Sequence, residues 1–157
     1  MSFVLVPMML LLLGAIQFGV IWATQTGVTN AVRDAARAAS LVQPKADSSG
    51  TVDAATETAY GNSIKTGQLM TGLAARVPFY SSTNLVSASV CYVSFTDITG
   101  NLALNATVTV TYGHPIFIPF LSGVLGSGIT TTSAESIAVG LDKPYTLPAA
   151  GTSGCSS

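Results

Sequence analysis

The chain opens with an apolar run that continues without a break into an amphipathic one. Residues 3–23 (FVLVPMMLLLLGAIQFGVIWA) contain no charged side chain, and Gln17 is their only strongly polar one. As a helix, this run spans about 31 Å, close to the roughly 30 Å of a bilayer's hydrocarbon core. In residues 24–42 apolar side chains recur at helical spacing. We therefore predict one helix over residues 4–42, ending before Pro44.

Small residues recur at every fourth position of this helix, from Ala15 to Ala39. Such spacing lets helix backbones approach closely and drives helix association in apolar surroundings. For residues 31–39 the helix propensity of alanine explains the pattern equally well. Glycine costs about 1 kcal/mol relative to alanine inside a helix, so the earlier positions indicate packing. The predicted helix-packing residues are Pro7, Gly14, Ala15, Gln17, Gly19, Ala23 and Gly27.

Residues 1–42 thus form one predicted unit, and residues 43–157 form a second, which we call the head domain. Residues 43–51 have the Pro, Asp, Ser and Gly content of a loop. Residues 52–75 show a weaker helical pattern interrupted by glycines, which predicts one helix or two short ones. Pro78 ends this pattern.

The rest of the head domain alternates in the manner of β-strands. Residues 84–95 and 102–112 predict an antiparallel hairpin with a turn at Gly100-Asn101. The apolar stretch 113–126, broken by prolines, predicts an irregular loop. Residues 129–141 alternate as a third strand, and the tail that follows is a polar surface segment. The predicted fold class is α+β: a long N-terminal helix, a short helix and an antiparallel sheet of about three strands.

Composition narrows the class of protein. Only 8% of the residues are charged, the net charge is −1, and the six basic residues are scattered. A nucleic-acid footprint needs clustered basic residues, so we predict no nucleic-acid partner. Cys91 and Cys155 stand 64 positions apart. In an exported chain they predict a disulfide that ties the polar tail to the head domain, the alternative being two unrelated thiols.

The N-terminal flank lacks the basic residues of an ordinary signal anchor. The first basic residues, Arg33 and Arg37, follow the apolar run. The positive-inside rule would then place the head domain in the cytoplasm. We favour a different interpretation, in which a short basic leader is removed from a longer precursor and the head domain lies outside.

No catalytic, metal or cofactor site is predicted. His114 stands alone beside Pro115, where a hydrogen-bonded loop histidine is more common than a catalyst. The serines lack a nucleophile elbow with histidine and carboxylate partners, and no Cys/His cluster has zinc spacing. Asp97, Thr99 and Asn101 could ligate calcium, but residues of this kind also form turns without a metal. We therefore expect a protein that is not an enzyme.

One cluster of charge lies just beyond the apolar run. Arg33 and Arg37 share a helix face at i,i+4 spacing, and Asp34 stands three residues before Arg37. A solvated helix face is one interpretation. The other is contact with carboxylates of a neighbouring subunit or with lipid headgroups.

Several segments together resemble the TadE-like pilus-assembly proteins. These are the apolar helix with a proline near its start, GAIQFG at 14–19, NAVRDAAR at 30–37, VTVTYGHPIFIPFLSG at 108–123 and ITTTSAES at 129–136. The likeness covers residues 3–42 and 102–139. Two positions depart from the family pattern: Ser2 stands where a glutamate is usual, and Gln17 replaces an acidic residue. Both changes remove a charge from the packed helices.

The resemblance implies a pilin-like fold and function. Such a chain would be translocated, cleaved by a prepilin peptidase, and assembled by the pilus machinery through its N-terminal helix. The leading hypothesis is a subunit of an extracellular type IV/Tad-like filament, a helical homo-oligomer that resides in the cytoplasmic membrane before assembly. The alternatives are a minor pilin or pseudopilin, and a membrane-anchored adhesin that does not form the fibre body.

Overall fold

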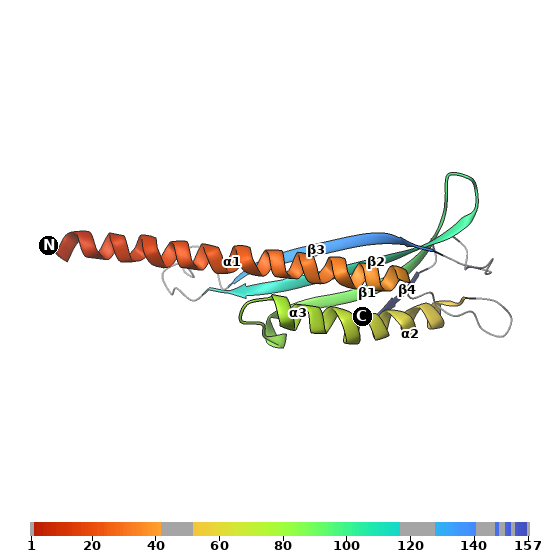
Figure 1. Ribbon diagram of the computed structural model, residues 1–157, viewed down its shortest axis with the longest axis horizontal. Helices are drawn as coiled ribbons and strands as arrows, with labels where there is room; N and C mark the ends of the chain where they lie inside the picture. The colour runs from red at the N-terminus through yellow and green to blue at the C-terminus, as the bar shows by residue number, and fades with distance from the viewer. Residues whose placement is uncertain are drawn as a thin grey trace.

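A single long helix dominates the molecule. The computed structural model describes residues 2–41, 52–116, 128–140, 147, 150–151 and 153–156. Helix α1 (Ser2–Leu41) has 40 residues and continues through Pro7, which confirms the predicted helix to within two residues at each end. Its N-terminal half projects from the molecule, whereas its C-terminal half lies along the sheet (Figure 1). The predicted boundary at residue 42 falls among residues 42–51, outside the described part.

The glycine-interrupted helical stretch forms two helices joined by a wider turn. Helix α2 (Ala54–Ile64) is followed by the π-helical turn η1 (Lys65–Leu69) and by α3 (Met70–Arg76). Asp53 caps α2, since its carboxylate accepts the N–H of Thr56 at 2.7 Å. This arrangement confirms the predicted helical pattern over residues 52–75.

The described residues form a four-stranded antiparallel sheet in the order β3-β2-β1-β4. Strands β1 (Leu85–Thr96), β2 (Leu102–Pro115) and β3 (Gly128–Val139) are the three that alternation predicted. Strand β4 (Ser153–Ser156) is additional to the three expected strands, and it corrects the expectation of a surface tail, because Gly154 and Ser156 are buried. Its sequence SGCS offers no apolar alternation, and it joins the sheet through main-chain pairing with β1.

Two predicted loops can be compared with the structure only in part. Residues 113–115, predicted as the start of an irregular loop, instead complete β2. Residues 117–126 of that apolar stretch lie outside the described residues, as does the other predicted loop, residues 43–51. At the turn between β1 and β2, Gly100 has φ +84°, a conformation that favours glycine, so the predicted turn is confirmed.

The core lies between one face of the sheet and the helices. Val28 and Val32 of α1 and Val108 of β2 are fully buried there. The hydroxyl of Tyr92 donates a hydrogen bond to the carbonyl of Ala39 at 3.2 Å, which ties β1 to the end of α1. The opposite sheet face carries cross-strand hydroxyl pairs such as Thr107–Ser136, at 3.1 Å. The C-terminal half of α1 is therefore an integral part of the head domain's core.

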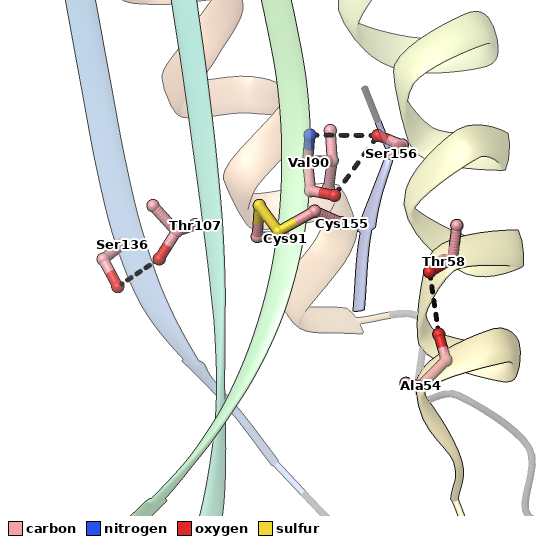
Figure 2. The surroundings of a disulfide bond; sticks show 8 residues. All are labelled: Ala54, Thr58, Val90, Cys91, Thr107, Ser136, Cys155 and Ser156. Carbon is pink, nitrogen blue, oxygen red and sulfur yellow. Dashed lines mark hydrogen bonds between the residues drawn. A yellow bond between two sulfur atoms is a disulfide. The ribbon is translucent and has the colours of Figure 1, made fainter. Parts of the chain in front are cut away.

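The predicted disulfide is present and fastens β4 to β1. Cys91 and Cys155 are directly opposite in the antiparallel register. Beside them the Ser156 hydroxyl accepts the N–H of Val90 at 3.0 Å and lies 3.2 Å from its carbonyl (Figure 2). The bond closes a long loop of chain, and such cross-links restrict the unfolded state.

Candidate functional site

The candidate site is the exposed apolar half of α1. Leu11 is 77% exposed and Phe18 is 65% exposed, although both are large apolar side chains. Twelve such side chains between residues 4 and 22 are exposed: Val4, Leu5, Val6, Met8, Met9, Leu10, Leu11, Leu12, Leu13, Ile16, Phe18 and Trp22. By length and composition, α1 can cross a membrane.

The exposed side chains set the kind of surroundings that this half of α1 needs. Burying one Leu, Ile, Phe or Met side chain gains about 1.5–3 kcal/mol. Transfer of all twelve side chains from water to an apolar environment would therefore be favourable by on the order of 20 kcal/mol. A continuous apolar surface of this size marks a membrane or protein contact. The amphipathic half of α1 has less need of such surroundings, because Val28, Val32 and most of its alanines are already buried within the head domain.

The structure divides the predicted helix-packing residues into two groups. Pro7, Ala15, Gly19 and Ala23 are exposed and Gly14 is half-buried, so all five lie on the projecting surface. A Cβ built at Gly14 or Gly19 meets no atom within 4 Å. These glycines therefore have no described contact within the chain that requires a small residue.

Gln17 and Gly27 form the second group and face their own head domain. Gln17 is only 6% exposed, and it lines a small hollow with Pro78, Phe79 and other residues of α1 and β2. A Cβ on Gly27 would lie 2.4 Å from the carbonyl oxygen of Arg76. Gly27 thus allows the end of α3 to approach α1, which is a contact within one chain.

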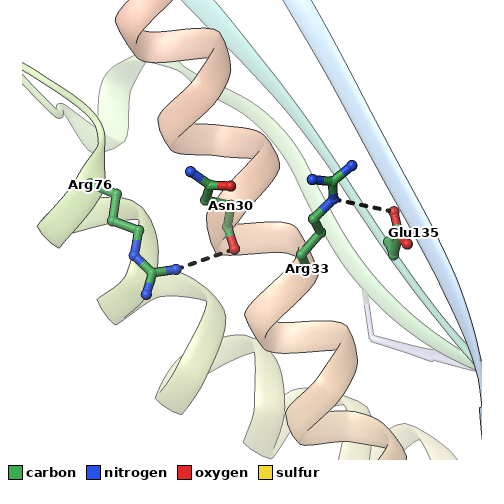
Figure 3. A network of polar contacts seen from close by, with 4 residues as sticks. All are labelled: Asn30, Arg33, Arg76 and Glu135. Carbon is green, nitrogen blue, oxygen red and sulfur yellow. Dashed lines mark hydrogen bonds and ion pairs between the residues drawn. The ribbon is translucent and has the colours of Figure 1, made fainter.

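The charged cluster on α1 is largely paired within the chain. The Arg33 guanidinium lies 4.0 Å from a carboxylate oxygen of Glu135 on β3, and Asp34 forms an ion pair with Arg76 of α3. Arg76 also donates to the carbonyl of Asn30 at 3.2 Å (Figure 3). Exposed pairs of this kind contribute about 1 kcal/mol or less, so they orient elements more than they stabilise them.

Arg37 differs from its neighbours in this cluster. It is exposed, and the described part of the chain supplies no ion pair to it. A shallow polar groove joins it to Asn30, Asp34 and Arg76 on the outer side of α1. Of the three charged residues predicted for contacts between subunits, Arg37 is the one whose charge remains available.

The residues singled out for possible chemistry have structural partners. The Nε2 of His114 lies 2.7 Å from the hydroxyl of Thr131, within the sheet and not in a loop. The carboxylate of Asp97 accepts N–H groups of Thr99 and Asn101 at 2.9 and 2.8 Å, which forms the turn between β1 and β2. The Thr99 hydroxyl also donates a hydrogen bond to this carboxylate, at 2.7 Å. This bond contributes most to holding the pKa of Asp97 below its usual value, and the N–H of Asn101 contributes next.

Sequence reasoning gave no site role to Glu57, Phe79 or Glu135. Glu135 occupies an inward-facing position of β3, where a lone carboxylate among Ser and Thr signals a basic partner. Glu57 is fully buried in α2, and neither of its carboxyl oxygens has a hydrogen-bond partner among the described residues. Burial raises its pKa to about 7, the nearby N–H of Gly154 offsets part of that rise, and the charge of Asp53 adds to it.

Comparison with known proteins bears on the N-terminal segment. Residues 1–37 match the family model described as TadE-like protein, which confirms the resemblance in that part of the chain. The match covers most of α1 and none of the described strands. No curated protein and no solved structure matches the chain.

Proposed function

We propose that this chain is a structural subunit of an extracellular type IV/Tad-like pilus filament, held together by its N-terminal helices. The observation that carries the proposal is the projecting part of α1 over residues 4–16, which is entirely apolar and which the described residues leave exposed apart from the half-buried Gly14. Before assembly this part would reside in the cytoplasmic membrane, and after assembly it would be buried among copies of itself.

The family match supports an association with Tad pili. It falls on α1, the element to which the proposal assigns assembly. We further propose that a leader is removed by a prepilin peptidase, that the pilus machinery inserts the subunit, and that the role is non-catalytic. The resemblance of α1 to the TadE-like proteins supports the removal of a leader and the insertion.

Small residues on the exposed surface favour bundled helices over a plain membrane anchor. Each glycine costs about 1 kcal/mol relative to alanine within a helix, and nothing in the chain's own described packing requires Gly14 or Gly19. A plain anchor would gain apolar surface from a larger residue. A helix that contacts other helices gains close backbone approach from a small one.

We predict that Gly19→Leu reduces the yield of fibres sharply while the head domain remains folded. Overpacking at a helix contact costs about 1–3 kcal/mol, and the cost recurs in every subunit of the fibre. Negative-stain electron microscopy of protein collected from cells measures the yield. Near-ultraviolet circular dichroism of the detergent-purified protein reports whether the head domain is folded.

Gly67→Leu is the matched control, because Gly67 is exposed on η1 and a Cβ there also meets no atom within 4 Å. Normal fibre yield is expected from this variant. Undiminished fibre yield from Gly19→Leu would contradict assembly through this face of α1. A wild-type protein that forms only micelle-bound particles would favour the minor pilin or the anchored adhesin.

A further inference from the structure

The segment between α3 and β1 displays an aromatic side chain in an unusual conformation. Phe79 has φ +54°, and it is the one described non-glycine residue with positive φ. Its side chain is nevertheless 77% exposed. Strained backbone of this kind persists only where the surrounding structure holds it, and it is often associated with function.

Phe79 lies beside the end of the apolar run of α1. The main chain of Arg76 and Val77 contacts Gly27, and the next two residues border a hollow whose α1 wall is formed by residues 17–24. Residues 76–79 therefore run along α1 toward its N-terminus, from the level of Gly27 to the level of residues 17–24. At 1.5 Å per helical residue this corresponds to about 10 Å. Phe79 ends level with the last two turns of the proposed membrane span.

Two exposed aromatic side chains of α1 occupy the same level. Phe18 and Trp22 have ring centroids 6.4 Å apart, and Trp22 is 64% exposed. Tryptophan is enriched where a membrane meets water, because its ring is apolar and its N–H can remain hydrated. The sequence from Pro78 to Asn84 (PFYSSTN) carries no charge that would oppose contact with lipid.

The sheet fixes the position of this segment. The N–H of Ser81 donates to the hydroxyl of Tyr112 at 3.0 Å, and the ring of Tyr80 stacks on Tyr112 with centroids 6.0 Å apart. Asn84 donates its N–H to the carbonyl of Ser81 at 3.1 Å, closing the turn before β1. Phe79 is thus presented by an anchored turn, at a set height on the molecule.

We propose that Phe79 inserts into the interfacial region of the outer leaflet, at the level of Trp22, while the subunit is in the membrane. The head domain then contacts the bilayer at a second point, which limits its tilt and rotation about α1. This inference rests on the proposed function, which places the apolar half of α1 in a membrane. The partner is the lipid interface, and a neighbouring subunit is the competing occupant.

Fluorescence quenching by brominated lipids tests this placement, because Trp22 is the only tryptophan in the chain. The reporter variant is Phe79→Trp with Trp22→Phe, reconstituted in phosphatidylcholine vesicles whose acyl chains carry bromine at defined depths. The exposed side chain leaves room for the larger indole ring. The matched control is Ile98→Trp with Trp22→Phe, since Ile98 is fully exposed in the β1–β2 turn at the far end of the head domain.

We expect the indole of the reporter variant to lose as much fluorescence as the native Trp22, most strongly with bromine near the carbonyl end of the chains. The indole of the control variant should lose none. Quenching of Trp22 in the parent protein without quenching of the reporter overturns this inference and leaves the proposed function intact. Protection of the reporter from aqueous acrylamide in fibres but not in vesicles would assign Phe79 to a subunit contact and also overturn it. An unquenched Trp22 would overturn the membrane placement of α1, and this inference with it.

Discussion

Gly27→Leu is expected to lower the free energy of unfolding of the head domain by about 3 kcal/mol, the upper end of the range for overpacking. A Cβ at this position would lie 2.4 Å from the carbonyl oxygen of Arg76 and 2.9 Å from its carbonyl carbon. Both are main-chain atoms, so no side-chain rotation can relieve the clash. Either α3 must move away from α1, or α1 must lift from the sheet. Urea unfolding in detergent, followed by the near-ultraviolet circular dichroism of the tyrosines, measures the loss.

Gly19→Leu provides the comparison for that measurement. A side chain there enters open space, so the head domain should keep its stability to within about 0.5 kcal/mol. Gly19 and Gly27 belong to the same row of small residues at every fourth position. We nevertheless expect Gly27→Leu to impair folding and Gly19→Leu to impair assembly. Equal stabilities for the two variants would contradict the described packing of α3 on Gly27.

The row of small residues at every fourth position from Ala15 to Ala39 shows that periodicity alone does not identify the contacting partner. Its spacing predicted close helix contact, and a close contact is present at Gly27, but the partner is α3 of the same chain. Ala31, Ala35 and Ala39 are likewise buried against the head domain. A repeat every four residues indicates that something approaches the backbone. It does not distinguish a neighbouring subunit from the chain's own fold, which depends on contacts distant in sequence.

The strands that could be predicted are those with one covered face. In β2 the buried apolar residues Leu104, Ala106, Val108 and Val110 alternate with the polar residues Asn105, Thr107 and Thr109 on the outer face, so the sequence pattern itself records the burial. Strand β1 follows the pattern less strictly, because Val93 and Phe95 face outward and Ser94 is buried. Strand β4 carries no such record, because its place is set by pairing with β1 and by Cys155. The disulfide was predictable from cysteine count and export, whereas the strand that it fastens was not.

The candidate site, like the sheet, was predictable from the sequence only in part. Uninterrupted apolar sequence identified the surface that projects from the head domain, because that surface is defined by composition alone. The ion pairs of Arg33 and Asp34 were not predictable, since their partners lie on β3 and α3. Phe79 is a further case: its sequence gives no sign that it stands level with Trp22. Only the path of the chain past Gly27 brings it there.

Glu57→Gln is expected to stabilise the head domain at neutral and alkaline pH and to have little effect in acid. The pKa of Glu57 is raised to about 7 from its ordinary value of 4.5, chiefly by burial. Below the lower value the carboxyl is protonated in both the folded and the unfolded state. Between the two values the unfolded chain releases the proton while the folded chain retains it. Stability therefore falls as the pH rises through this window.

The expected size of that fall is at most about 3.5 kcal/mol, at about 1.4 kcal/mol for each unit between the two pKa values. Glutamine has the same shape and stays neutral, so the variant should lack this part of the decline. Urea unfolding at several pH values between about 4 and 8 measures the difference between the two proteins. Other carboxyl groups titrate equally in both and cancel.

Glu135→Gln is the control, because it removes a carboxylate that is partly exposed, unlike Glu57, and that is paired with Arg33. This variant should keep the decline of stability between acid and neutral pH.

Glu57 faces Gly154, where a Cβ would lie only 2.4 Å from the Cβ of Glu57, so the charge develops directly beneath β4. Cys155 fastens that strand covalently, which allows the head domain to retain β4 when Glu57 ionises. A parallel decline in Glu57→Gln and in the parent protein would show that Glu57 does not ionise in a buried position.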